Sequence, residues 1–532
     1  MLLLLLFGCA FIVQFVDSSP LASPTTSTPI NSTIPEFAAV ASSSPSPDTC
    51  KDIDSCRTQY TIVWSSLLTI FACVWTAIHR NVPAPKEAGG SRRRRIVGKV
   101  WEATKIVVVT ILVPEWVLSW AVRQFLTARH VREKLERARG DAERKWKEKR
   151  ERLKVARQEL TEVDMMDDQS VSGTGSEASP LLQAENDSQS TSNHARESVE
   201  KSKMSEELAF DGKSIGKSKA LAANKQIGRL DSSEWDSNWT IRHGFFVIMG
   251  GFHHYKDRRP QHPLSPGDVV QLVKSGDLAP PTDEEIGNLS QTDVLSKTIA
   301  IFQTLWFVVQ AIARGIEGLP ITQLEIMTLA YTVITVAMYV AWWDKPQNVG
   351  GPVRVAVKQL PEPGRVEVWE RYLSIFAVIA GAQDQFVDLR KERCVPTFYS
   401  GSTNDGNAGF ADIIALCAAM MFGAVHCAAW HYAFPTDVEK IVWRVSSLAI
   451  VALPAAILAP MLVSLLISRL LDSSSMLTNV FGAMFLLVVA VSALLYIAAR
   501  SLLLALSFST LRSLPPEAYR AVQWTLLIPH FT

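Results

Sequence analysis

The stretch SSSMLTNVFGAMFLLVVAVSALLYIAA, residues 473–499, contains no charged side chain. A helix needs about 20 mostly apolar residues to cross the ~30 Å hydrocarbon core of a bilayer, and its backbone groups then pair within the helix. A soluble core helix rarely continues for this length without a polar face. The stretch therefore predicts a transmembrane helix.

Further stretches of the same character lie on its N-terminal side. Those with at most one charged residue are 60–78, 298–313, 321–343, 411–430 and 441–468. Another, 372–386, is a weaker candidate because Asp384 lies near its end. Together these stretches predict an all-α membrane protein with about seven transmembrane helices. Most of them form a predicted helical bundle at 297–508.

The composition of the whole chain conceals this organisation. The 532 residues carry a net charge of +1 and are 48% hydrophobic, which are averages that suit a soluble protein. Residues 123–158, however, contain 14 Lys and Arg against 6 Asp and Glu. This segregation excludes a simple soluble enzyme. The sequence also contains no phosphate-binding loop, Ser-His-Asp signature or nucleic-acid motif, so we expect no cofactor and no nucleic-acid partner, and the sequence leans away from an enzyme without deciding the point.

The N-terminal residues indicate entry into the secretory pathway. Residues 1–22 hold an apolar run followed by small residues, which predicts a signal peptide, with an uncleaved anchor as the alternative. Residues 23–59 are rich in Ser, Thr and Pro and predict a luminal stalk, glycosylated at the sequon of Asn31. Cys50 and Cys56 can form a disulfide in an oxidising lumen. We therefore expect an integral protein of the plasma membrane or an endomembrane.

Basic residues after the first span predict its orientation. Arginines at 92–95 place this segment in the cytosol, because short cytosolic loops carry an excess of Lys and Arg. An apolar stretch at 106–126 follows, and Pro114 and Glu115 interrupt it. Since both of its flanks are basic, we expect a re-entrant or interfacial helix with both ends in the cytosol. With the first span it forms the segment 60–126.

The same rule gives a prediction for the C-terminal tail. Arg500, Arg512 and Arg520 place the tail, residues 509–532, in the cytosol. Counting back from there requires 372–386 to cross the membrane. That crossing leaves the basic segment 390–393 on the luminal side, which conflicts with the rule used to orient the tail.

A large insert, predicted to be cytosolic, separates the first span from the others. Residues 127–160 predict a basic helix, and the segment 123–160 either lies on anionic lipids or is a solvated helix with intrahelical ion pairs. Residues 161–236 are rich in Ser and acidic side chains and predict disorder with phosphorylation sites. Residues 237–296 contain helix-capping signals and predict a small folded segment.

Polar residues within the spans are the candidate functional residues, because they are costly in a membrane. These candidates are Gln303, Gln310, Arg314, Glu325 and His426. Gln303, Gln310 and Arg314 lie on one helical stripe. Glu325 closes a capping box that starts at Thr322, which explains it without a functional role. For His426 the alternative to a functional role is an interhelical hydrogen bond.

Histidines are also concentrated in the folded part of the insert, at His243, His253, His254 and His262. Imidazoles bind zinc, but no cysteine or carboxylate at the spacing of a known site accompanies them. The pattern favours packing or surface positions, and we predict no metal site.

Motifs along the chain carry a family resemblance. They include Pro114-Glu115-Trp116, His243-Gly244-Phe245-Phe246, Gln303-Thr304-Leu305-Trp306-Phe307, Thr322-Gln323-Leu324-Glu325, Phe422-Gly423-Ala424-Val425-His426 and Ile528-Pro529-His530. The chain resembles a large family of uncharacterised multi-pass membrane proteins of mushroom-forming (basidiomycete) fungi. The resemblance runs from near the first span to the C-terminus and omits the stalk and the disordered insert. It implies the membrane architecture and no activity.

Three hypotheses for function follow from this organisation. A receptor- or sensor-like protein fits a luminal ectodomain, a helical bundle and a phosphorylatable insert, and it is the leading hypothesis by analogy. A transporter or channel requires Gln303, Gln310, Arg314 and His426 to line one polar path. A membrane-embedded enzyme requires His426 or the histidines near His253 to meet carboxylates.

Overall fold

The computed structural model describes residues 56–85, 92–172, 238–290, 294–356, 384, 387–401, 407–470 and 476–522. The predicted signal peptide, most of the stalk, residues 173–236 of the insert and all but Asp384 of the weak span at 372–386 lie outside the described residues. The chain divides into two compact units, of which the smaller comprises residues 132–240 and 267–282. All of the membrane helices belong to the larger unit.

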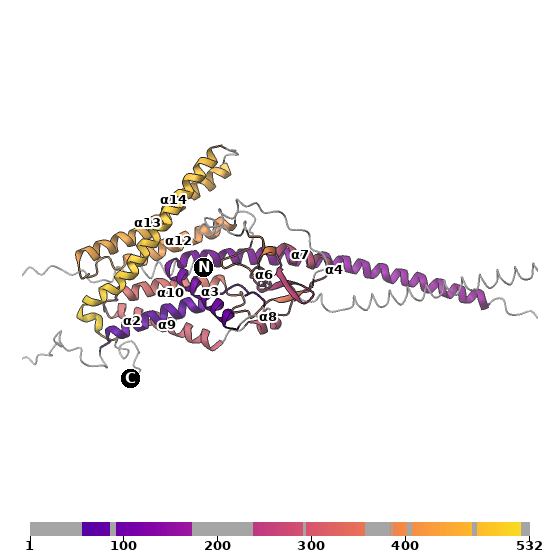
Figure 1. Cartoon of the computed structure of the whole chain (residues 1–532), viewed down its shortest axis with the longest axis horizontal. Helices are drawn as coiled ribbons and strands as arrows, with labels where there is room; N and C mark the ends of the chain where they lie inside the picture. Colours follow the sequence, from indigo (N-terminus) through magenta and orange to yellow (C-terminus); the bar gives the residue numbers. More distant parts are fainter. Residues whose placement is uncertain are drawn as a thin grey trace, which may run out of the picture. The chain divides into compact units, whose positions relative to one another are not determined.

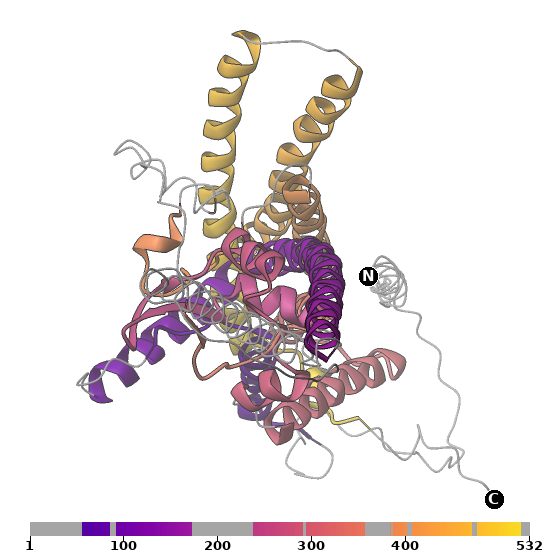
Figure 2. The ribbon, with the colours of Figure 1, turned by 90° about the vertical axis from the view of Figure 1, so that its right-hand side faces the viewer.

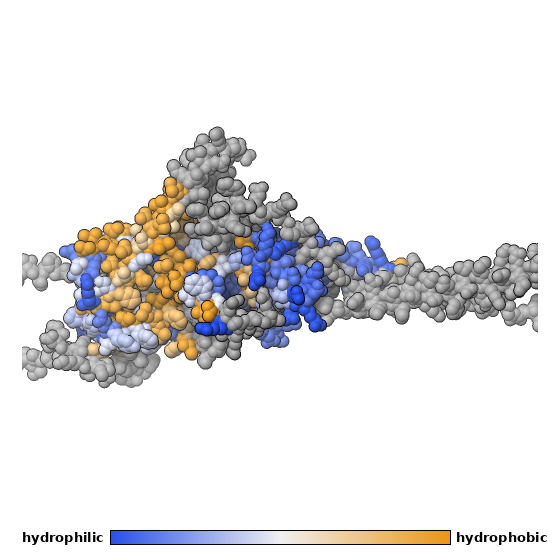
Figure 3. Space-filling model, viewed as in Figure 1, coloured by the Kyte–Doolittle hydropathy of each residue, from blue (hydrophilic) through white to orange (hydrophobic). Residues whose placement is uncertain are grey.

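Six helices within the described residues are long and apolar enough to cross a membrane. They are α2 (Gln59–Ala77), α9 (Val294–Ile316), α10 (Gln323–Ala341), α12 (Asn407–Cys427), α13 (Asp437–Leu470) and α14 (Met476–Ser509) (Figure 1). Apolar side chains gather on the surface of this bundle (Figure 3), as contact with lipid requires. The prediction of an all-α membrane protein is confirmed.

Neighbouring helix pairs hold the bundle together. α2 packs against α9 and α10, α10 packs against α12, and α13 packs against both α12 and α14 (Figures 1 and 2). Gly423 of α12 permits the close approach to α13, since a Cβ there would lie 2.7 Å from the side chain of Val451. Small residues commonly allow membrane helices to approach this closely.

Helices α3 (Arg92–Leu112) and α4 (Pro114–Ser172) meet at a bend of 113°. Pro114 starts α4, where its missing N–H is no loss, and its ring prevents α3 from continuing. The bend lies inside the bundle, because the hydroxyl of Tyr331, halfway along α10, donates to the carbonyl oxygen of Ile111. Within the membrane region the chain therefore makes a sharp helical corner.

Both arms of this corner return to the same loop of the chain. In α3, the carboxylate of Glu102 accepts a hydrogen bond from the Thr397 hydroxyl at 2.7 Å. In α4, the Gln124 amide donates to the carbonyl oxygen of Tyr399 at 2.7 Å. The two helices therefore form a re-entrant hairpin that enters and leaves on one side of the bundle. The bent pair is either a broken span or a re-entrant loop, and the re-entrant or interfacial helix expected from the two basic flanks stays a prediction.

The insert and the loop after α10 together build a small sheet. Its strands are β1 (Phe252–Lys256), β2 (Arg259–Pro263) and β3 (Val353–Val355), in the order β2-β1-β3. β1 pairs antiparallel with β2 and parallel with β3. The short helices α6 (Ile241–Ile248) and α8 (Asp283–Leu289) belong to the same unit as the sheet, and α7 (Pro266–Ser275) belongs almost entirely to the smaller unit. Since β3 comes from beyond α10, the predicted folded segment 237–296 does not complete this sheet alone.

The first and last described segments lie on the same face of the bundle, here called the N-terminal face (residues 56–58 and 514–520). The backbone N–H of Arg57 donates to the carbonyl oxygen of Tyr519 at 2.7 Å, and Cys56 pairs with Arg520 in an isolated β-bridge. A luminal stalk and a cytosolic tail are therefore incompatible, because bonded residues cannot lie on opposite sides of a bilayer. The six candidate spans within the described residues, an even number, agree with this placement.

The opposite side of the bundle is here called the insert face (residues 79–82, 342–345 and 396–399). The sheet lies there, since the N–H of Val82, just after α2, donates to the carbonyl of Met249 at 2.8 Å. β3 pairs with β1, and the short 3₁₀ helix η3 (Leu389–Lys391) contacts β2. The chain thus enters and leaves 357–383 on one face. The basic segment 390–393 therefore lies on the insert face, and its predicted luminal position stays a prediction.

Helix α4 continues without interruption to Ser172, through the boundaries predicted at 126 and 160. Its apolar positions in the smaller unit, Leu135, Ala138 and Ala142, are buried. Its charged residues pair along the helix, as Arg139 does with Glu136 and Glu143. This geometry favours the solvated helix with intrahelical pairs. Binding of anionic lipids by this helix stays a prediction.

Candidate functional site

The tip of the re-entrant hairpin carries a carboxylate into the bundle. Glu115 lies in the first turn of α4 and is 6% exposed. Neither of its carboxylate oxygens has a hydrogen-bond partner among the described residues. Its electrostatic interactions are with Arg500 and with the hydroxyl of Tyr496, both on α14. A buried carboxylate in this setting is costly, so its position requires an explanation.

Arg500 is the cation that faces this carboxylate. It lies halfway along the candidate span 487–513 and is 2% exposed. Its guanidinium carbon lies 3.4 Å from the ring centroid of Phe422 and 5.2 Å from that of Tyr331. None of its three guanidinium nitrogens makes a hydrogen bond of good geometry in the described part of the chain, and the Tyr331 hydroxyl interacts with them only weakly. Arg500 was expected to mark the cytosolic tail, and the structure corrects this because α14 extends to Ser509.

His426 is the one predicted candidate that belongs to this cluster. Its Nδ1 lies 2.7 Å from the carbonyl oxygen of Phe422, and its carbonyl accepts from the Trp443 indole at 3.2 Å. Its Nε2 has no partner among the described residues, and its ring interacts electrostatically with Arg500. The interhelical hydrogen bond to Trp443 therefore uses the backbone carbonyl of His426 and leaves its Nε2 without a partner among the described residues.

We call Glu115, Tyr331, His426, Tyr496 and Arg500 the intramembrane cluster. It combines one carboxylate, one guanidinium, two phenols and one imidazole, which come from α4, α10, α12 and α14. Buried polar groups are normally hydrogen-bonded, and those that are not mark a functional group or a site for water or an ion. The cluster can therefore bind a small polar species.

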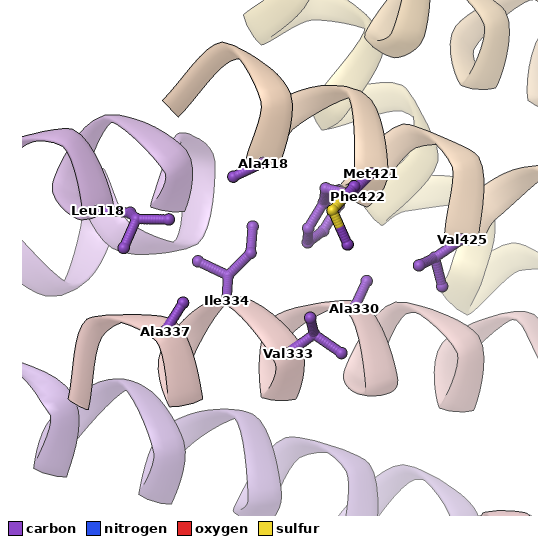
Figure 4. A pocket seen from close by; sticks show the side chains of 9 residues that line it. All are labelled: Leu118, Ala330, Val333, Ile334, Ala337, Ala418, Met421, Phe422 and Val425. Atoms are coloured by element: carbon purple, nitrogen blue, oxygen red, sulfur yellow. The ribbon is translucent and has the colours of Figure 1, made fainter. Parts of the chain in front are cut away.

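A narrow apolar crevice adjoins the cluster (Figure 4). It is lined by Leu118, Ala330, Val333, Ile334, Ala337, Ala418, Met421, Phe422 and Val425. These residues come from α4, α10 and α12, and their side chains point toward one another across the gap (Figure 4). The space holds about one water molecule. The ring of Phe422 belongs to both the crevice and the contact with the Arg500 guanidinium.

The other predicted intramembrane residues do not join the cluster. The Gln303 amide donates to the Thr69 hydroxyl at 3.2 Å, between α9 and α2. Gln310 is half-buried on α9. Arg314 donates to the carbonyl oxygens of Pro320 and Arg520, each at 2.7 Å, near the N-terminal face. Gln303, Gln310, Arg314 and His426 therefore form no shared path in the described structure.

Glu325 has a structural role at the N-terminal face. Its backbone N–H and carboxylate form a capping box with Thr322, as the sequence predicted. The same carboxylate accepts two hydrogen bonds from the guanidinium of Arg57. Bidentate pairs of this kind are the strong form of the Arg–carboxylate contact. The segment before α2 is thereby attached to the start of α10.

The predicted modifications of the stalk are only partly described. Cys56 is disulfide-bonded. Cys50, its expected partner, and Asn31, the expected glycosylation site, lie outside the described residues. The pairing and the glycosylation stay predictions.

Three of the four insert histidines, His253, His254 and His262, lie in the small sheet, and His243 is buried in α6. The rings of His254 and His262 lie 5.3 Å apart across the β1–β2 pair. Burial, and then the neighbouring His262 and His254, lower the pKa of His253 to about 4. No group of three or more His, Cys, Asp or Glu in the described ranges is arranged to hold a metal ion.

A second buried cation, Lys345, lies at the insert face. Its ammonium donates to the Gln124 side chain at 2.7 Å and to the carbonyl oxygen of His79. It also lies 4.9 Å and 4.8 Å from the ring centroids of Trp120 and Trp342. Burial lowers the pKa of Lys345 well below its usual value, whereas these acceptors and ring faces stabilise the charged form. The contacts join α2, α4 and α10.

Sequence reasoning did not identify Arg500, Glu115 or Lys345 as site residues. The signal for Glu115 was present, since it follows a proline in the middle of an apolar stretch. Arg500 directly follows the charge-free run 473–499. A predicted span that started further along this run would have contained Arg500 near its middle. Nothing in the order of residues indicates that these two side chains meet.

These features define a class: a polytopic helical membrane protein with a re-entrant hairpin and a charged cluster inside its bundle. The chain belongs to a family of unknown function, DUF8562, which matches residues 34–175, 207–363 and 394–531. The match includes Glu115, His426 and Arg500. It also begins within the stalk and covers 207–236, so the family extends further than the sequence motifs indicated. No curated protein and no solved structure matches the chain.

Proposed function

We propose that this protein is a membrane transporter or channel whose substrate passes through the intramembrane cluster. One observation carries the proposal: the re-entrant hairpin places Glu115 at its tip, opposite the hydrogen-bond-free guanidinium of Arg500. In many transporters the substrate and ion sites lie near the bilayer midplane and are formed by discontinuous helices. Helix ends at this depth are tolerated where they are buried in protein or line a water-filled cavity.

The ends of α3 and α4 contribute to such a site. The first turn of α4 presents the positive end of its dipole beside Glu115, and the last turn of α3 presents carbonyl groups such as that of Ile111. Tyr331 connects these two ends to α10 through its hydrogen bond to Ile111. The polar path is thus different from the one predicted along Gln303 and Gln310.

The test is ion flux through liposomes that contain the full-length protein. Proton, chloride and potassium fluxes are followed with an internal pH-sensitive dye and ion-selective electrodes. We expect flux above that of protein-free vesicles, and a change in its rate on substitution Glu115→Gln. The matched control is Arg512→Gln, at an arginine of the same chain end that is exposed and paired with Glu439. Flux no higher than that of protein-free vesicles for every ion tested would contradict the proposal. A flux rate in Glu115→Gln equal to that of the natural protein would also contradict it.

A second candidate is the receptor- or sensor-like function, and the continuity of α4 supports it. The helix that holds Glu115 in its first turn runs unbroken to Ser172, about 1.5 Å per residue. A change at the cluster can therefore be transmitted along a rigid element. Hydrogen exchange of residues 132–160 in liposomes tests this, and exchange that is the same in the natural protein and Glu115→Gln would contradict it.

We further propose the orientation of the protein in a secretory-pathway membrane. The insert face carries the arginines at 92–95 and is cytosolic by the positive-inside rule, so the N-terminal face is luminal. This accords with the disulfide of Cys56. A signal peptide at 1–22, a glycosylated Asn31 and a distribution among basidiomycete fungi complete the proposal. Glycan mapping tests it: modification of Asn238 or Asn288, on the insert side, would reverse the orientation.

A further inference from the structure

We propose that Arg500 binds a small monovalent anion, and that Glu115 is a built-in competitor which yields to that anion when it takes up a proton. This inference rests on the proposed transport function and names its substrate class. In the structure the guanidinium of Arg500 makes no hydrogen bond of good geometry with a described residue, and the Tyr331 hydroxyl is its one weak polar contact among them, although the residue is 2% exposed. A guanidinium presents five N–H donors and prefers anionic oxygens or similar acceptors.

The charge balance of the cluster determines how an anion can enter. A buried site in a membrane tolerates little net charge. Arg500 is positive and Glu115 is the one carboxylate that it interacts with, so their charges sum to zero. An anion that joined this pair would leave a net negative site. If one proton adds to the Glu115 carboxylate as the anion binds Arg500, the sum is again zero.

The surrounding titratable groups fit this assignment. Tyr496 of α14 and Tyr331 of α10 interact with both Glu115 and Arg500 and contribute phenol hydroxyls. His426 of α12 interacts with Arg500, so a proton on its ring would add a second positive charge. α13 contributes Trp443, and the last turns of α3, residues 106–112, carry no charged side chain. Glu115 is therefore the proton acceptor that keeps the occupied site neutral.

The step is balanced in protons and charge. The Glu115 carboxylate and one proton form the carboxylic acid, and the anion takes the place of the carboxylate as the counter-charge of Arg500. No covalent bond other than the O–H bond forms, and nothing is oxidised or reduced. The species that moves is one anion with one proton, which carries no net charge across the membrane.

Anion binding is tested with purified full-length protein in detergent. The thermal midpoint is measured against chloride, nitrate or formate concentration at pH 5 and pH 8, with gluconate holding the ionic strength constant. A ligand that binds the folded state raises the midpoint. We expect stabilisation at pH 5 and an apparent affinity that falls by about tenfold per pH unit where Glu115 ionises, because one proton binds with each anion.

Two substitutions separate the roles of the pair. Glu115→Gln resembles the protonated acid, so anion stabilisation should become independent of pH and equal to that of the natural protein at pH 5. Arg500→Gln should abolish it, and Arg500→Lys, which retains the charge if the first variant fails to fold, should weaken it by roughly tenfold or more. Arg512→Gln is the matched control and should behave as the natural protein. Equal stabilisation by gluconate, or an unchanged pH dependence in Glu115→Gln, would overturn the inference.

Flux measurements distinguish this inference from the function on which it rests. In the natural protein, chloride entry should be accompanied by proton entry. In Glu115→Gln, chloride should enter without protons. Chloride binding at Arg500 without any flux would contradict transport and retain the anion site. Flux of potassium or protons without chloride binding would support transport and overturn the anion site.

Discussion

Gln124 is the residue whose removal should most weaken the attachment of α4 to the bundle. Its side-chain oxygen accepts from Lys345 at 2.7 Å and from the Trp342 indole at 3.0 Å. Its amide donates to Asn81 at 3.1 Å and to the carbonyl oxygen of Tyr399 at 2.7 Å. The residue is fully buried. The substitution Gln124→Ala removes all of these bonds together.

The magnitude follows from what each partner retains. Tyr399 keeps the Trp120 indole at 3.0 Å, so its carbonyl stays satisfied. The Trp342 indole loses its acceptor, and an orphaned buried donor costs about 1–3 kcal/mol. Lys345 loses one acceptor, and a hydrogen bond to a charged group contributes about 1.5–3 kcal/mol. We therefore expect the free energy of unfolding to fall by roughly 3–5 kcal/mol.

The assay is reversible unfolding of the full-length protein in mixed detergent and dodecyl sulfate micelles, followed by tryptophan fluorescence. Gln310→Ala is the matched control, since Gln310 is half-buried on α9, and it should cost less than about 1 kcal/mol. In a double-mutant cycle with Lys345→Met, the two changes should be coupled by about 1 kcal/mol or more. A cost below ~1 kcal/mol for Gln124→Ala, or a coupling of zero, would refute the assigned network.

Three further outcomes follow from the structure. Glu325→Gln removes the counter-charge of Arg57 at a largely buried pair, so the free energy of unfolding should fall by roughly 2–4 kcal/mol. Proteolysis of the segment before α2 should become faster, and an unchanged rate would disprove the attachment. Gly423→Ala forces α12 away from α13 and should lower the free energy of unfolding by about 1–3 kcal/mol. Gly409→Ala is the control and should be tolerated, because the nearest atom to its added Cβ lies 3.6 Å away. Equal costs would count against the close packing. The pKa of His253 is lowered to about 4 in the folded protein, so the unfolded chain binds a proton first as the pH falls. Stability should therefore decline between about pH 6.5 and 4, and His253→Phe should reduce that decline. An identical pH profile in the variant would show that another group is responsible.

Local sequence signals account for the elements of the fold. The apolar runs predicted the helices that cross the membrane, because a buried backbone must pair with itself and length follows from bilayer thickness. Thr322 and Glu325 predicted the start of α10, since a capping box involves residues only three positions apart. Pro114 predicted the break between α3 and α4, because a proline ring acts on the residues directly before it. Each of these signals acts over a few residues.

The topology and the site depend on contacts between distant residues. The bond between Arg57 and Tyr519 places these two residues on one face, whereas charge counting had predicted opposite sides for the stalk and the tail. Arg500 is an apparent flanking charge in the sequence and a mid-membrane cation in the structure, because α14 extends beyond the apolar run. Charge rules assume that flanking residues reach the headgroups, and they fail where a partner lies inside the bundle.

What the sequence by itself determined, then, is the set of helices and the kind of solvent around them, because hydrophobic length and capping are local properties. The tertiary structure alone decided that Glu115 faces Arg500, that His426 joins them, and that Gln303 and Arg314 do not. The physical reason is that a buried charge is tolerated only through the groups packed around it. Those groups come from four separate helices, and their meeting is set by packing rather than by spacing along the chain.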